Sequence, residues 1–239
     1  MKNAYMIMAH HHFRQLGILV ELLDGRDNDI YIHIDSKAGA VDMDEIRRCA
    51  RFSVITFIPR QSVTWGGESQ IWCELSLLGE ALTRHHDYYH LLSGDDLPIK
   101  PNAYIDSFLH SHAGTEFVGI SQWGTKGEVP ASLLDRVRYR YPWQDRLGRK
   151  RSLASRACTS LQRLARCDRL SGFDGLLGKG SNWFSITEPF ASYVYEREKE
   201  IRRIFAETRN CDEVFLQTVL LNSPFSKHLN HRDDDNEMA

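Results

Sequence analysis

The chain has 239 residues, 42% hydrophobic and 26% charged, which is enough to bury the core of one large α/β domain or of two small ones. A net charge of −2 excludes strong overall attraction to nucleic acid, and no apolar run approaches the ~20 residues of a membrane-spanning helix. The five cysteines are an odd number without CxxC spacing, which favours reduced thiols in a cytoplasm over a disulfide framework or a zinc site.

Strand and helix patterns alternate through the first half of the chain. Buried strands are expected at residues 4–9, 29–35, 53–58, 88–92 and 115–121. Helices are expected at residues 13–23, 42–50, 69–84 and 102–112. This alternation predicts a mainly parallel sheet with helices on both faces.

Polar residues stand at the ends of three of these strands: His10 after the first, Asp35 as the last residue of the second, and Asp95 with Asp96 after the fourth. Ligands of open α/β sheets bind at the carboxyl ends of the strands, so these side chains are candidates for a binding site. Other interpretations remain open. Asp35 can pair with Lys37, and the two adjacent acids can cap the next helix or hold Mg²⁺ or Mn²⁺ with a diphosphate.

Two further features of the first half invite a ligand. Trp65 stands beside two glycines, which offers a flat ring and a backbone free to approach a ligand closely. The histidines at 10–12 suggest a metal, but three consecutive residues of a strand cannot all face one ion, and no HxxxH or HExxH spacing supports them.

From residue 122 to 177 the alternation fails, and the segment reads as a basic insertion into the domain. Its arginines are interleaved with aromatic residues around Tyr141, without an ordered nucleic-acid motif. An amphipathic basic helix is predicted at 152–170, with its apolar face at Leu153, Ala157, Leu161 and Leu164. The insertion faces a phosphate-bearing or acidic substrate, an anionic membrane surface, or solvent.

The sheet resumes with an aromatic strand inside 178–187, followed by a charged helix at 190–208 and a last helix at 214–221. Glu213 stands in the first turn of that helix beside Asp212. Glu213 is either a general base held at a rigid helix start, or a first-turn acid without a functional role beside Asp212 as the N-cap. The tail at 230–239 is predicted to be acidic and disordered, which leaves one domain over 1–229.

No Walker A, GxSxG or GxGxxG motif occurs, so kinase, α/β-hydrolase and dehydrogenase functions are excluded. A set of other motifs resembles one family. In chain order these motifs are AYMIMAHH, IYIHIDSKA, SVTWGGESQ, YYHLLSGDDLPIKP, GKGSNWFSIT and CDEVFLQTVL. Their order and spacing, from about residue 4 to 221, are similar to the core-2/I-branching β-1,6-N-acetylglucosaminyltransferase and xylosyltransferase family (glycosyltransferase family 14).

The resemblance implies a single GT-A-like (Rossmann-type) domain and an inverting transfer of a sugar, GlcNAc or xylose, from a UDP-sugar to a hydroxyl of a glycan or lipid-linked glycan acceptor. No N-terminal anchor is seen, which points to a bacterial-type member. Such a member would be cytoplasmic, in peripheral contact with the inner face of an anionic membrane, and would act in surface polysaccharide or lipopolysaccharide synthesis. No nucleic-acid partner is expected.

The resemblance also assigns roles to residues. Glu213 is the implied general base. The residues implied on the donor side are His10, Asp35, Trp65, Asp95, Asp96 and Ser181. The residues expected on the acceptor side are Arg138, Arg140, Tyr141, Trp183 and Asp212.

No metal or other cofactor is expected, because members of the family lack a metal-binding DxD and balance the diphosphate with Arg and Lys of a C-terminal region. Near this chain's end stand only Lys227, His231 and Arg232. Either the chain is truncated, or arginines of the insertion or a metal at Asp95 and Asp96 take that role. Two alternatives remain open: a catalytically inactive module that binds sugar nucleotides or glycans, and a metal-dependent GT-A transferase that uses those two acids.

Overall fold

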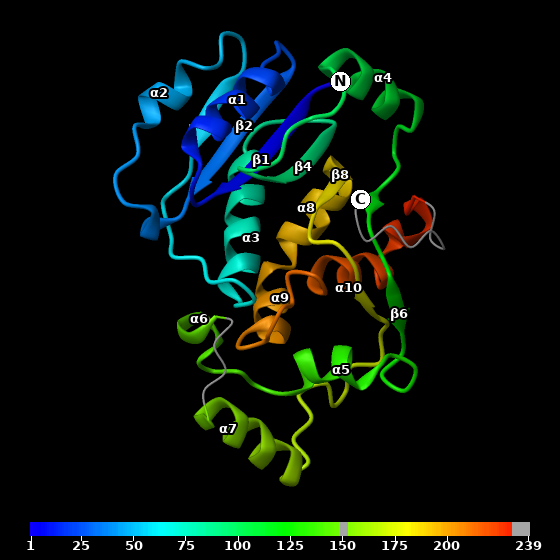
Figure 1. The fold of residues 1–239 in the computed structure, drawn as a ribbon. Coiled ribbons are helices and arrows are strands. Elements are labelled where there is room, and N and C mark those ends of the chain that lie inside the picture. The colour runs from blue at the N-terminus through cyan, green and yellow to red at the C-terminus, as the bar shows by residue number, and fades with distance from the viewer. Residues whose placement is uncertain (149–152, 231–239) are drawn as a thin grey trace. The chain divides into compact units, whose positions relative to one another are not determined.

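The computed structural model describes residues 1–148 and 153–230 (Figure 1). They form two compact units. The first comprises Met1–Ser62, Cys73–Phe117 and Trp183–Tyr195, and the second Val63–Trp72, Val118–Asn182 and the residues from Glu196 onward. The insertion expected at 122–177 lies wholly within the second unit. All of the tail predicted to be disordered except Asn230 lies outside the described residues.

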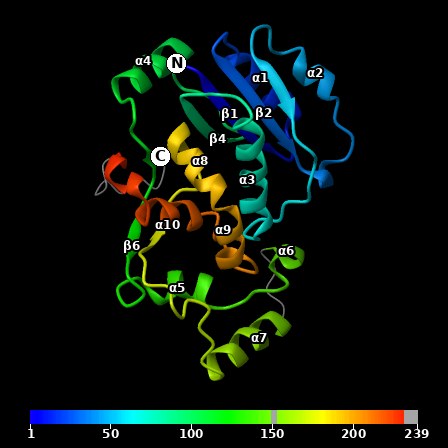
Figure 2. The same ribbon diagram turned by 180° about the vertical axis from the view of Figure 1, so that it is seen from behind.

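The main sheet has the strand order β3-β2-β1-β4-β8-β5. The four strands of its parallel part are β1 (Asn3–Ala9), β2 (Asn28–Ile34), β3 (Val54–Phe57) and β4 (Tyr88–Ser93). Figures 1 and 2 show β1 beside β2 and β4 from both sides. The antiparallel partner of β4 is β8 (Phe184–Thr187). The predicted α/β class with a mainly parallel sheet is confirmed, whereas the strand expected at 115–121 shrinks to β5 (Phe117–Val118).

One face of the sheet carries the aliphatic core of the first unit. α1 (Phe13–Leu23) begins and ends where its periodicity predicts, and buries Leu16, Leu19, Val20 and Leu23. These side chains pack in one cluster with the isoleucines of β2, and α2 (Met43–Arg47) adds Ile46. Apolar residues at helical and at alternating spacing thus meet on this face, as their periods require.

The other face is covered too. Met6, Tyr31 and His33 alternate with the aliphatic positions, so they point to the opposite side of the sheet, and all three are buried. Within the unit, Gly79 of α3 (Ser69–Ala81) lies against Tyr195 of α8 (Glu188–Glu196), whose ring a β-carbon would contact at 2.5 Å. The prediction of protein cover on both faces is confirmed.

The turn after β4 depends on a glycine. Gly94 donates a 2.9 Å hydrogen bond to the carbonyl of Met8, and a β-carbon there would lie 2.8 Å from that of Ala9. Only glycine lets the ends of β1 and β4 approach this closely. α4 (Asn102–Ser111) then begins after Pro101, and among the described residues no side chain caps its N-terminus by a hydrogen bond. The acids of the turn therefore do not cap this helix.

The second unit is mainly helical. Its two-stranded sheet pairs β6 (Gln122–Gly124) with β7 (Leu177–Lys179). Its helices are α5 (Ala131–Arg138), α6 (Gln144–Leu147), α7 (Leu153–Leu164), α9 (Glu198–Phe205) and α10 (Phe215–Leu221). Short 3₁₀ turns are η1 (Ser36–Ala38), in the first unit, and η2 (Pro224–His228). The helix expected at 190–208 is interrupted at Arg197, which separates α8 from α9.

α7 confirms the predicted helix from Leu153 onward, while Ser152 lies outside the described residues. Its leucines do not form a core: Leu153, Leu161 and Leu164 are 83%, 65% and 83% exposed. The helices α5, α9 and α10 do contribute buried residues to the unit, and Phe205 of α9 meets Phe215 of α10 edge to face. Across 1–148 and 153–230, no helix combines the length and apolar character needed to cross a membrane.

Candidate functional site

The carboxyl ends of β1, β2 and β4 gather one group of polar side chains in the first unit. We call His10, His11, His12, Asp35 and Asp95 the strand-end cluster. Partial desolvation lowers the pKa of His10 and the neighbouring His11 lowers it further, while Asp95 and Asp35 act in the opposite direction. His10 therefore senses both carboxylates, as expected for adjacent parallel strands that end at the same sheet edge.

Asp35 is buried at the end of β2 and already has partners. Its carboxylate accepts a 2.8 Å hydrogen bond from the backbone N–H of Lys37, and the Lys37 ammonium lies 3.6 Å away. Arg60 donates to the Asp35 carbonyl at 2.7 Å. The pairing with Lys37 that the sequence left open is present. It places a cation at this edge of the sheet, beside the carboxylate expected to meet a ribose.

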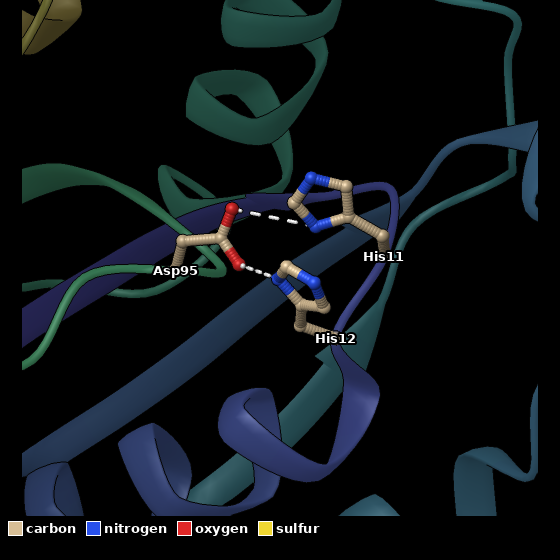
Figure 3. Close-up of side chains that lie close together, drawn as sticks. All are labelled: His11, His12 and Asp95. Carbon is tan, nitrogen blue, oxygen red and sulfur yellow. Dashed lines mark hydrogen bonds and ion pairs between the residues drawn. The ribbon is translucent and has the colours of Figure 1, made fainter.

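Asp95 faces the histidines that follow β1 (Figure 3). Nδ1 of His12 lies 3.0 Å from one of its carboxylate oxygens and Nδ1 of His11 lies 3.3 Å from the other. Asp96 points elsewhere, because its carboxylate accepts a 2.8 Å hydrogen bond from the backbone N–H of Ser93 and so closes the turn. The two acids thus have separate contacts, which does not favour a cation shared between their carboxylates.

Trp183 also belongs to the first unit, immediately before β8, and is half-buried. The remaining predicted residues lie in the second unit. Among them Glu213 has the most specific contacts: Nη1 of Arg136 lies 2.7 Å from its Oε2 and also donates to the carbonyl of Asn210. The Glu213 side chain is 35% exposed. It lies in the turn before α10, not in the first turn of that helix as the sequence predicts.

Asp212 points inward, whereas Glu213 is accessible. One Asp212 oxygen accepts a 2.9 Å hydrogen bond from Gln70, and burial raises the pKa of this carboxyl to about 6, with the nearby Glu213 charge adding to the rise. Gln70 also accepts a hydrogen bond from the backbone N–H of Gly66. Asp212 therefore links the turn before α10 to the loop that carries Trp65, which is a structural contact within the unit.

Trp65 is 50% exposed, and its neighbouring glycines make room for other parts of the second unit. A β-carbon on Gly66 would lie 2.4 Å from the side chain of Asn210, and one on Gly67 only 1.9 Å from that of Asp145. The segments that approach these glycines closely are therefore parts of the same chain, at Asn210 and Asp145. Asp145 also accepts a 2.6 Å hydrogen bond from the hydroxyl of Ser69.

Ser181 is held through its backbone, since Gln217 of α10 donates to its carbonyl and to that of Gly119. The backbone N–H of Gly180 donates at 2.9 Å to the carbonyl of Glu213. These bonds join the GSNW segment to the turn that carries Glu213. Gln217 is fully buried, and no pattern in the sequence separates it from its apolar neighbours.

The basic residues expected to meet an acceptor are paired with acids. The Arg138 guanidinium lies 3.6 Å from Asp168, and Arg140 forms an ion pair with Glu207. Tyr141 donates from its hydroxyl to the carbonyl of Asp135. Such pairing offsets the positive charge that the sequence alone suggests is available to a diphosphate.

Sequence reasoning missed Arg136, Gln70 and Asp145, which hold Glu213, Asp212 and the Trp65 loop. Each stands far along the chain from its partner, and single charged or amide residues at such separations carry no local signal. It also missed that His11 and His12 face Asp95. This arrangement depends on the left-handed conformation at His12 (φ 52°), which breaks strand alternation. Residue spacing in the sequence does not reveal that conformation.

Comparison with known proteins adds three similarities. Xylosyltransferase 2 of Rattus norvegicus is 25% identical over 238 residues, 95% of this chain and 25% of the relative. Xylosyltransferase 2 of Homo sapiens and xylosyltransferase oxt of Drosophila melanogaster are each 25% identical over 232 residues, covering 92% and 93% of this chain and 24% of each relative. The chain therefore spans about a quarter of the length of these curated relatives.

A solved structure of mouse xyloside xylosyltransferase 1 in its apo form aligns over 95% of this chain and 84% of that one, with 8% identity and a TM-score of 0.39. A likeness at this level is too weak to support an inference. The family model described as Branch, Core-2/I-Branching enzyme, does support an inference, because it matches residues 3–137, which is more than half of the chain. The chain belongs to the Core-2/I-Branching enzyme family.

Proposed function

We propose that the chain is an inverting glycosyltransferase that moves a sugar from a UDP-sugar to a hydroxyl group of a glycan acceptor. Family membership and the similarity to xylosyltransferases over nearly the whole chain support the transferase class. Because those relatives are named for xylose transfer, xylose is the first sugar to test, and GlcNAc is the second. The observation that carries the catalytic role is the accessible Glu213 carboxylate fixed by Arg136.

Glu213 is proposed as the general base. The acceptor oxygen attacks the anomeric carbon and forms the new glycosidic bond while the bond from that carbon to the phosphate oxygen breaks. UDP leaves with the electron pair, and the acceptor proton passes to the Glu213 carboxylate. One displacement of this kind inverts the anomeric configuration. The ion pair with Arg136 limits the orientations of the carboxylate, which reduces the entropy lost on reaching the reactive geometry.

His10 and Asp35 of the strand-end cluster, together with Lys37, are proposed to bind the nucleotide of the donor. Asp35 offers carboxylate oxygens to the ribose hydroxyls, and the Lys37 ammonium beside it provides positive charge for a phosphate. His10 adds an imidazole to the same edge for the uridine. These roles agree with the resemblance of the sequence and rest on groups that belong to the first unit alone.

Calorimetric titration with UDP, UDP-xylose and UDP-GlcNAc tests donor binding, each in EDTA and in Mn²⁺. Binding of UDP in EDTA is the expected result. Binding only in Mn²⁺ would favour the metal-dependent alternative, and no binding under either condition would contradict the proposal. Binding without turnover would favour the inactive sugar-nucleotide-binding module.

A second proposal concerns α7, which we propose to contact an anionic membrane surface. Leu153, Leu161 and Leu164 fall within one stripe of the helix and are exposed, and Arg156 and Arg163 lie along one side of that stripe. Residues 146–169 hold eight Lys or Arg and one acid, Asp168. An apolar stripe bordered by arginines suits insertion among acidic headgroups. Such contact would bring the chain to an acceptor built on a lipid carrier, as in surface polysaccharide or lipopolysaccharide synthesis on the cytoplasmic side.

A further inference from the structure

The ends of β1 and β4 bring three potential metal ligands together (Figure 3). These strands are adjacent in the sheet, with Met8 opposite Ser93, so the residues that follow them emerge side by side. His11 and His12 come from the first strand's end and Asp95 from the other. One nitrogen from each ring and one carboxylate oxygen all lie within 4.8 Å of one another.

The backbone makes this arrangement possible. β1 ends at Ala9, and His12 adopts a left-handed conformation (φ 52°, ψ 45°), so the side chains no longer alternate as they do in a strand. The rings of His11 and His12 lie 4.0 Å apart between centroids, and both turn Nδ1 toward the acid. Gln15 of α1 donates to the carbonyl of Asp95, which ties the two strand ends together.

The separations suit a bound ion. Zn–N and Zn–O distances of about 2.0–2.2 Å place the ligand atoms of a tetrahedral site about 3.3–3.6 Å apart. The Nδ1 atom of His11 lies 3.3 Å from one Asp95 oxygen and that of His12 lies 3.0 Å from the other, so each separation is near that range. An ion bound by both rings and one carboxylate oxygen would replace these two contacts to Asp95.

The ligand types select a class of metal. Two imidazoles with one carboxylate suit zinc and neighbouring transition metals, whereas Mg²⁺ and Ca²⁺ prefer oxygen ligands alone. Asp96, whose carboxylate is bound to Ser93, is not part of the set. We propose that His11, His12 and Asp95 bind one divalent transition-metal ion of the zinc class, with a coordination position left for water or an anionic oxygen. This proposal stands whether or not the chain transfers a sugar.

The test is titration of the full chain, purified without a polyhistidine tag, with Zn²⁺ by calorimetry and with Co²⁺ by visible absorption. One ion per chain and the visible bands of a low-symmetry Co²⁺ site are expected at pH 7.5. If neither Zn²⁺ binding by calorimetry nor Co²⁺ bands by absorption were detected, the proposal would be overturned.

Variants identify the ligands. Asp95→Asn should weaken Zn²⁺ binding at least tenfold, and the double variant His11→Ala/His12→Ala should abolish it. The matched control His110→Ala/His228→Ala removes two exposed histidines outside the cluster and should bind as the parent does. Circular dichroism of each variant checks that it is folded. Equal binding in the parent and in a folded cluster variant, or an equal loss in the control, would assign the ion to another place and refute the proposal.

Discussion

Arg136 and Glu213, 77 residues apart in the sequence, form an ion pair with 2.7 Å between Nη1 and Oε2. The same Arg136 nitrogen donates to the carbonyl of Asn210, so the guanidinium is fixed at both contacts. An acid in an otherwise buried turn is thus held in one orientation while about a third of its side chain stays accessible. This is the geometry expected of a general base whose direction matters to the reaction.

Removing this ion pair should slow turnover more than it weakens donor binding. Arg136→Met is expected to lower kcat about tenfold while the donor KM changes less than twofold, because it disturbs the orientation of the base and not the nucleotide contacts. Arg136→Lys should recover part of the loss. Steady-state assays of UDP release measure both parameters. Arg47→Met, which removes an equally short ion pair to Asp44, is the control, and parent-like kcat in Arg136→Met would refute the positioning role.

Asp35 should matter for the nucleotide. Asp35→Asn is expected to weaken UDP binding about tenfold or more, since the amide removes one acceptor from the ribose and the negative charge that places Lys37. Calorimetry measures the dissociation constant. Asp29→Asn is the matched control, because Asp29 lies on the same strand at the opposite end, paired with His86. Equal affinity in Asp35→Asn and the parent would remove Asp35 from the nucleotide site.

Glu116 should make stability depend on pH. It is 1% exposed and accepts hydrogen bonds from the backbone N–H and the hydroxyl of Thr187, and burial raises its pKa to about 7. Between its ordinary value of 4.5 and about 7, the unfolded chain loses this proton while the folded chain keeps it, so stability falls as pH rises through that window.

The variant Glu116→Gln keeps the shape of the protonated carboxyl without the titration. From pH 5 to pH 8 the parent should lose about 1–3 kcal/mol of unfolding free energy relative to this variant. Urea denaturation at a series of pH values measures the difference. The exposed Glu196→Gln on α8 should follow the parent, and a difference in the opposite direction for Glu116→Gln would show that the folded state holds the ionised form.

The exposed face of α7 should govern binding to membranes. Leu153→Ser/Leu161→Ser/Leu164→Ser is expected to weaken binding to vesicles of phosphatidylcholine and phosphatidylglycerol (3:1) at least tenfold, because it removes the apolar stripe. Cosedimentation measures the bound fraction. The control Ile18→Ser/Leu22→Ser/Ile99→Ser alters exposed apolar residues of the first unit and should bind normally. If the parent bound neutral vesicles as well as the anionic ones, or bound neither kind of vesicle, the proposed contact would be excluded.

Much of the fold could be predicted because its signals are local. The periodicity of Phe13–Leu23 and of the β2 isoleucines fixes which side chains meet in the core, and glycine after β4 marks the end of the strand. The apolar residues of α7 follow the same pattern but stay exposed. Periodicity establishes an amphipathic helix, and only the surrounding structure shows whether its apolar face has a partner.

The candidate site was predictable only in part, for a related reason. His10, Asp35 and Asp95 could be grouped because parallel strands end at one sheet edge. The contacts of Glu213 with Arg136 and of Asp212 with Gln70 join residues distant in sequence, which a single chain without aligned relatives does not reveal. The glycines beside Trp65 were interpreted as space for a ligand, whereas Asp145 and Asn210 occupy that space.

The most direct test of the central proposal is UDP release from UDP-xylose and UDP-GlcNAc, measured side by side for the parent chain and Glu213→Gln. The control is Glu198→Gln, which breaks a surface ion pair with Arg202. Release by the parent and the control, a fall of at least a hundredfold in Glu213→Gln, and unchanged UDP affinity in all three are the predicted results. Equal turnover by Glu213→Gln and the parent would contradict the assignment of the base, and no release from either donor by the folded parent would contradict the proposed transfer itself.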